Sequence, residues 1–105
     1  MSSHVALARQ QWEEGNRRLE SLREPDPSLY RALLELADVV TGELRGRIGQ
    51  TFTMDELTAE YERAEDWSRE AIDESEPPVA WPRHLATVVD AAFHEYARGA
   101  TDYEP

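Results

Sequence analysis

The densest group of ionisable side chains lies between Asp55 and Glu76, in the stretch DELTAEYERAEDWSREAIDESE, which holds ten carboxylates and two arginines. Carboxylates at this density could bind a metal ion or attract a basic protein surface. The stretch contributes a charge of −8 to a chain whose net charge is −11. Such a field repels phosphate backbones and anionic lipid headgroups, so nucleic acid and membranes are disfavoured as partners and a basic protein is favoured.

A metal site would require ligands that converge. Calcium-binding loops alternate carboxylates with a glycine at the turn, and the acidic stretch contains no glycine. The nearest alternative combines Asp90 and His94, four residues apart, with Glu35 and Asp38, three apart. These pairs match only in part the Glu-x-x-His pairs of carboxylate-bridged metal bundles. A helical bundle that binds a metal ion through carboxylate and histidine ligands stays open as an alternative, although we expect neither a metal ion nor a cofactor.

Signals for other catalytic chemistry are absent from the sequence. The chain has no cysteine, which excludes thiolate nucleophiles and disulfides. Neither a Gly-x-Ser-x-Gly elbow nor a glycine-rich phosphate loop occurs. We expect the three histidines, His4, His84 and His94, at surface positions. The sequence therefore predicts a protein that is not an enzyme.

Hydrophobic spacing predicts four helices that would position these groups. Apolar or small residues recur every three or four positions over residues 3–23, the spacing of a narrow helical stripe. Residues 27–48 form the most apolar segment, with Asp26 as its N-cap and Pro27 as its first residue, and we expect this helix to be central. Within it, Gly42 and Gly46 indicate either a close helix approach or an early end.

The third and fourth helices are expected over residues 53–74 and 82–98. Thr53 and Glu56 have the spacing of a capping box, which places the start of the third helix. Three prolines between residues 77 and 82 separate it from the fourth, for which Pro82 is a plausible first residue and Gly99 a natural C-cap. The fold class predicted is all-α, a compact four-helix bundle-like single domain over residues 1–99, with a short acidic C-terminal tail at 100–105.

The carboxylates of the third helix are segregated onto one side. At 100° per residue, Glu62, Asp66, Glu70 and Asp73 lie roughly opposite the inward-facing Leu57. This pattern is typical of a solvated helix face, and it equally suits an electrostatic docking surface for a basic partner. In the proline-rich connection, Trp81 would either close the bundle or stand exposed as an anchor. The candidate partner-binding residues are therefore Glu62, Asp66, Glu70, Asp73 and Trp81.

The other large aromatic side chains are predicted to be mostly core residues. They occupy helical positions that for the most part face inward. The set comprises Trp12, Tyr30, Tyr61, Trp67, Phe93 and Tyr96.

DNA binding is the main alternative. The stretch QTFTMDELTAEYERA loosely resembles the opening helix of helix-turn-helix domains, which implies a transcription-associated role. Recognition of DNA requires basic and polar side chains facing a groove. The fourth predicted helix carries Arg83, His84 and Arg98, but it also carries the acidic Asp90 and Glu95. This mixture is a poor match to a phosphate backbone, so a regulatory or adaptor protein is favoured over a DNA-binding one.

Self-association and localisation follow from the same patterns. The stripe of the first helix has coiled-coil spacing over about two and a half heptads, so a homodimer and a monomer are both compatible with the sequence.

The amino terminus lacks a basic segment followed by an apolar run, and no stretch approaches the roughly 20 apolar residues that span a bilayer. We therefore expect a cytoplasmic protein.

Overall fold

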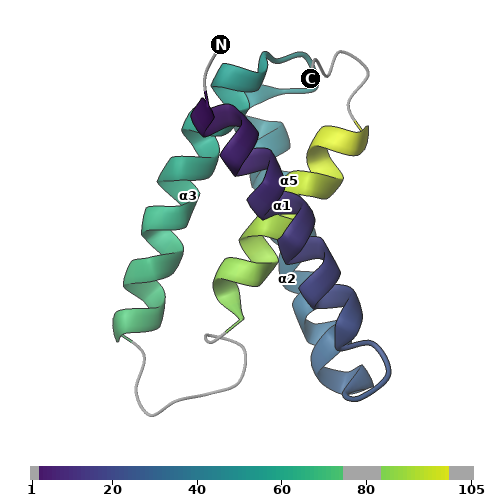
Figure 1. Ribbon diagram of the computed structural model, residues 1–105. Coiled ribbons are helices and arrows are strands. Elements are labelled where there is room, and N and C mark those ends of the chain that lie inside the picture. Colours follow the sequence, from purple (N-terminus) through teal and green to yellow (C-terminus); the bar gives the residue numbers. More distant parts are fainter. Residues whose placement is uncertain (1–2, 75–83, 100–105) are drawn as a thin grey trace.

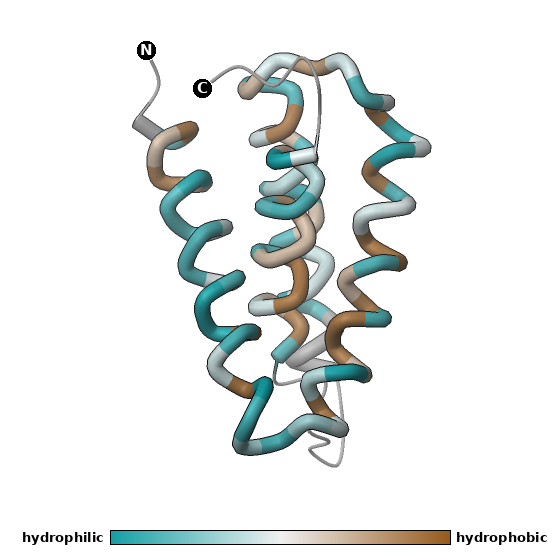
Figure 2. Tube along the Cα trace, turned by 90° about the vertical axis from the view of Figure 1, so that its right-hand side faces the viewer, coloured by the Kyte–Doolittle hydropathy of each residue, from teal (hydrophilic) through white to brown (hydrophobic). Residues whose placement is uncertain are grey.

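The computed structural model describes residues 3–74 and 84–99, which form four helices and contain no strand. These are α1 (Ser3–Ser21), α2 (Pro27–Ile48), α3 (Met54–Glu74) and α5 (Leu85–Gly99). Figure 1 shows α1 crossing α5, with α3 along one side of the bundle. Figure 2 shows hydrophobic and hydrophilic residues alternating along the helices, as expected where one face of each is buried. The predicted all-α bundle is confirmed, and no described helix is long and apolar enough to cross a membrane.

The predicted helix starts depend on local hydrogen bonds that the structure contains. The Asp26 carboxylate accepts the Leu29 amide at 3.2 Å, which makes it the N-cap of α2. Thr53 and Glu56 form the reciprocal capping box: the Thr53 hydroxyl accepts the Glu56 amide at 3.1 Å, and the Glu56 carboxylate accepts the Thr53 amide at 2.9 Å. At the end of α2, Gly49 has a φ of 70°, a conformation that only glycine adopts at low cost.

Two helix boundaries differ from the prediction by more than one residue, and two differ by one residue: α3 begins at Met54 and α5 ends at Gly99. α1 ends at Ser21, two residues before the predicted end, and is followed by a turn. α5 begins at Leu85, after a turn at His84, and not near residue 82. Residues 82 and 83 lie outside the described part of the chain, as does the predicted tail at 100–105.

The helix at the centre of the bundle is α5, so the expectation that α2 would be central is wrong. α5 packs against each of the other three helices, and its buried residues include several small ones that permit close approach from several directions. α2 instead keeps apolar side chains at the surface, since Leu34 is 37% exposed and Val39 58% exposed. The buried residues of α5 are Leu85, Thr87, Val88, Val89, Ala91, Ala92, Phe93, Tyr96 and Ala97.

An aromatic cluster joins three of the helices. The ring of Trp12 on α1 lies 5.7 Å from that of Tyr61 on α3 and 5.8 Å from that of Phe93 on α5, and the last two rings are 5.2 Å apart. Near the α2–α3 connection, Phe52 stacks on Tyr96 with centroids 5.1 Å apart. These contacts hold α1, α3 and the connection against α5.

The close helix approach occurs at Gly15 of α1. A Cβ at this position would overlap the Cβ of Asp90 and lie 3.1 Å from the Thr87 carbonyl oxygen, both on α5. A Cβ on Gly42 or Gly46 would meet nothing within 4 Å, so the expectation of a close approach at those two residues is wrong, and α2 continues past both of them to Ile48.

Candidate functional site

The carboxylates that were predicted to share one side of the third helix lie on α3, opposite its buried stripe. Glu62, Asp66 and Glu70 are exposed, whereas Leu57 and Tyr61 are almost fully buried. Asp73 belongs to α3, but its side chain is outside the described part of the structure, and Trp81 lies wholly outside it. Three of the five predicted site residues are therefore brought together on one exposed surface, which we call the acidic face: Glu62, Asp66 and Glu70.

The two arginines of α3 leave part of the acidic face uncompensated. Arg63 pairs with Glu60, which is not part of the acidic face, at 3.0 Å. Arg69 pairs with Asp66 at 3.4 Å and with Glu65 at 3.8 Å. Among the described residues, Glu62 and Glu70 form no ion pair. These two carboxylates therefore present their full charge to solvent.

An exposed aromatic side chain borders the acidic face. Trp67 is 51% exposed, so the prediction that it faces the core is wrong, although Trp12, Tyr61, Phe93 and Tyr96 are buried as expected. Trp67 follows Asp66 directly and lies one helical turn before Glu70. Aromatic side chains in such positions commonly supply the buried area of protein interfaces.

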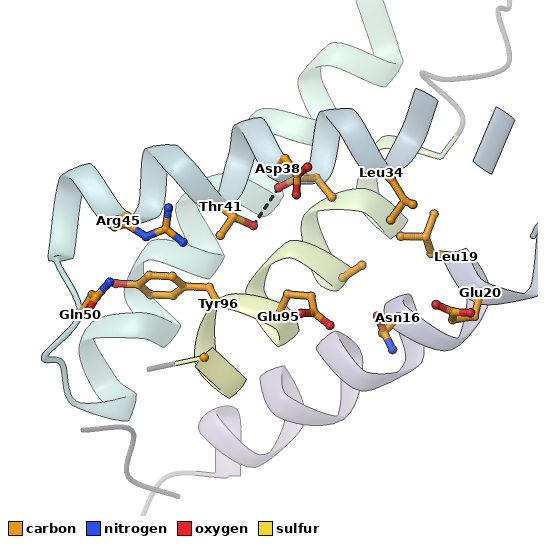
Figure 3. Close-up of a pocket in the computed structure, with 13 residues that line it drawn as sticks. Asn16, Leu19, Glu20, Leu34, Asp38, Thr41, Arg45, Gln50, Glu95 and Tyr96 are labelled. Carbon is orange, nitrogen blue, oxygen red and sulfur yellow. Dashed lines mark hydrogen bonds between the residues drawn. The ribbon is translucent and has the colours of Figure 1, made fainter. Parts of the chain in front are cut away.

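A second surface feature is a groove bounded by α1, α2 and α5, shown in Figure 3, with a volume of about 360 Å³. Tyr96 lies at one end with Arg45 and Gln50, and Leu19 and Leu34 lie towards the other. We call this cavity the α1–α2–α5 groove. Its position is separate from the acidic face, because no α3 residue lines it.

Some polar groups that line the groove have hydrogen-bond or ion-pair partners, and others do not. Tyr96 is only 4% exposed, and its hydroxyl has no hydrogen-bond partner among the described residues. Burial raises the pKa of Tyr96, while the positive charge of Arg45 acts in the opposite direction. Two carboxylates that line the groove already have arginine partners: Glu95 pairs with Arg98 at 3.0 Å and Glu20 pairs with Arg23 at 3.8 Å.

A third polar feature links α5 to α3. The Tyr61 hydroxyl donates a hydrogen bond of 2.6 Å to the Asp90 carboxylate, with the side-chain Oε1 of Gln11 3.3 Å from the same hydroxyl. Desolvation raises the pKa of Asp90 to about 6; the Tyr61 hydrogen bond and Arg18 lower it, while Glu65 and Glu14 raise it further. Burial and the Asp90 charge also raise the pKa of Tyr61. The pair is a buried polar contact between helices.

The raised pKa of Asp90 predicts a pH-dependent stability. Since the ordinary value is 3.8 and the folded value about 6, the native state binds more protons between these values, and the free energy of unfolding rises as the pH falls through this window. The full shift is equivalent to about 3 kcal/mol, and partial exposure of Asp90 reduces the expected effect to about 1 to 2 kcal/mol.

The variant Asp90→Asn should abolish this component while keeping an oxygen that accepts the Tyr61 hydrogen bond. Urea unfolding of the wild type and of Asp90→Asn between about pH 4.5 and pH 7.5 gives the difference between their free energies of unfolding. The contributions of the other carboxylates are common to both proteins and cancel in this difference. A difference that does not change with pH would contradict the assignment to Asp90.

The residues considered for metal binding are not brought together. Asp90 faces Tyr61 of α3 and Gly15 of α1, whereas Asp38 lines the groove from α2. Within residues 3–74 and 84–99, no group of three or more histidine, aspartate or glutamate side chains could hold a metal ion.

Comparison with known proteins finds no matching family model, no similar curated protein and no similar solved structure.

Sequence reasoning found the acidic face and missed the groove. The α3 carboxylates follow each other at helical spacing within one segment, so their common face is readable from the sequence. Arg45 and Tyr96 lie on different helices, and no spacing relates them. The one available signal was Tyr96 itself, because a buried tyrosine normally requires a partner for its hydroxyl.

Proposed function

We propose that this chain is a non-enzymatic, cytoplasmic protein-interaction module of regulatory or adaptor type, which docks a basic protein partner on the acidic face of α3. The observation that carries the proposal is the exposure of Glu62 and Glu70 without ion pairs among the described residues, on either side of Asp66. The opposite stripe of the same helix is buried in the core, so this surface is held in place by the fold.

Charge supports a basic partner because the acidic face is unfavourable by itself. Glu62, Asp66 and Glu70 succeed one another at four-residue spacing, and like charges so placed cost a few tenths of a kcal/mol per pair in an isolated helix. A partner carrying arginine or lysine would relieve this repulsion and be steered towards the face. The half-exposed Trp67 offers apolar area beside the charges, as an anchor would.

The DNA-binding alternative draws less support from the same geometry. A recognition helix needs a free face with basic or polar residues, whereas α5 is covered by the three other helices. α3 would approach the phosphate backbone with its exposed carboxylates.

Self-association through the narrow stripe of α1 is also disfavoured. Ala8, Trp12 and Leu19 of that stripe are buried in the core of the single chain, so they are not available to a coiled coil. A homodimer would have to use another surface.

The test is charge reversal on the acidic face. The triple variant Glu62→Lys, Asp66→Lys, Glu70→Lys is compared with a matched control, Glu13→Lys, Glu24→Lys, Glu35→Lys, which changes net charge equally at exposed positions outside α3. Both are used as baits in affinity capture from native lysate at several salt concentrations. We expect a salt-sensitive basic protein to be captured by the wild type and the control and lost with the α3 variant.

Two results would contradict the proposal. An unchanged set of captured proteins after reversal on α3 would show that the face is only solvated. Equal loss with the control variant would show attraction by overall charge, without a docking surface.

A further inference from the structure

The α1–α2–α5 groove contains two opposite charges that no other described residue neutralises. Arg45 and Asp38 both line it from α2, and neither forms an ion pair within the described part of the chain. They are seven residues apart, which corresponds to about 10 Å along a helix axis. The groove therefore has a positive and a negative residue about two turns apart on one helix.

The positive end also holds a buried donor without a partner. The Tyr96 ring points towards Arg45 and Gln50 in Figure 3, and its hydroxyl is buried with no hydrogen-bond partner in the described part of the chain. Leaving a buried hydroxyl unpaired is costly, and a bound oxygen acceptor would remove that cost. Gln50 is an exposed residue of the α2–α3 connection, so its side chain can shift to admit such a group.

On α2, the lining residue between the two charges is the uncharged Thr41, whose hydroxyl already donates to the Ala37 carbonyl oxygen at 2.8 Å. The volume of about 360 Å³ is at the lower end of the range for small-molecule sites. A short aliphatic chain fits this lining.

We propose that the α1–α2–α5 groove binds a small zwitterion, with its carboxylate at Arg45 and Tyr96, its aliphatic chain past Thr41, and its ammonium or guanidinium group at Asp38. A dianion such as a phosphate ester is disfavoured, because Asp38, Glu20 and Glu95 all line the same cavity. This activity is separate from docking on the acidic face and does not depend on it.

The charge requirement is tested with three related probes. ε-Aminocaproate carries both charges, caproate only the carboxylate and hexylamine only the ammonium group. Each is titrated into the isotopically labelled protein while backbone amide shifts are followed by NMR. We expect saturable shifts confined to the groove, near Arg45, Tyr96 and Gly99, with ε-aminocaproate binding roughly fivefold more tightly than either single-charge probe, the upper end for one exposed ion pair.

Variants at each end separate the two contacts. Arg45→Gln and Tyr96→Phe should weaken ε-aminocaproate and caproate alike, while Asp38→Asn should bring ε-aminocaproate down to the affinity of caproate. Tyr96→Phe keeps the ring and removes only the unpartnered hydroxyl, so it should fold normally. Arg31→Gln, an exposed position of α2 outside the groove, is the matched control and should bind like the wild type.

The proposal is overturned if ε-aminocaproate produces no saturable shifts in the groove. It is equally overturned if caproate binds as tightly as ε-aminocaproate to the wild type, or if the two α2 variants, Arg45→Gln and Asp38→Asn, bind like the Arg31→Gln control.

Discussion

Replacing Gly15 with alanine is expected to lower the free energy of unfolding by about 2 to 3 kcal/mol, because the new methyl group has no space between α1 and α5. Its Cβ would overlap that of Asp90, an atom next to the backbone that cannot swing away, and would press on the Thr87 carbonyl oxygen. The two helices must then separate along their crossing. This cost exceeds the gain of about 1 kcal/mol that alanine brings over glycine within a helix.

Gly42→Ala provides the matched control in another helix. A Cβ there meets nothing within 4 Å, so the helix-propensity term acts alone and the variant should be more stable by up to about 1 kcal/mol. Urea unfolding followed by circular dichroism measures both changes. If the two alanine variants shift stability in the same direction, the close approach at Gly15 is not a constraint on the fold.

Truncating Phe93 is expected to lower the free energy of unfolding by about 3 to 5 kcal/mol. Phe93 is 0% exposed and its ring contacts those of Trp12 and Tyr61, which come from two other helices. Alanine leaves a cavity where α1, α3 and α5 meet, and small domains have only about 5 to 15 kcal/mol of stability in total. Phe93→Ala should therefore lose a large part of the total stability, and thermal melting should show a strongly lowered midpoint.

Trp67→Ala is the control for aromatic truncation. Trp67 is half exposed on α3, so removing it should change stability by less than about 1 kcal/mol. In the affinity capture described above, the same variant should weaken capture of the basic partner. Comparable destabilisation by Trp67→Ala and Phe93→Ala would contradict the burial assigned to these two residues.

Local signals in the sequence were sufficient to predict where the helices of this fold lie. The Asp26 N-cap and the Thr53–Glu56 capping box depend on residues three apart, so their positions could be predicted and the structure contains them. The acidic face was equally predictable, because residues three or four positions apart lie on the same side of a helix.

The arrangement of the helices could not be obtained in this way. The apolar character of α2 predicted a central position, yet small residues made α5 the helix on which the others pack. Asp90 was considered as a metal ligand, and the structure pairs it with Tyr61 from another helix. Contacts between residues distant in sequence leave no periodic pattern in the chain, so the Tyr61–Asp90 pair and the groove became visible only in the folded structure.

The central position of α5 has a consequence for the order in which the core can be completed. During synthesis the chain emerges from its amino terminus, so α1, α2 and α3 are all made before the helix that covers their apolar stripes. Trp12 and Tyr61 have no Phe93 to pack against until residues 85–99 have appeared. The contacts of the native core with α5 must therefore form after α5 has been translated, between residues far apart in the sequence.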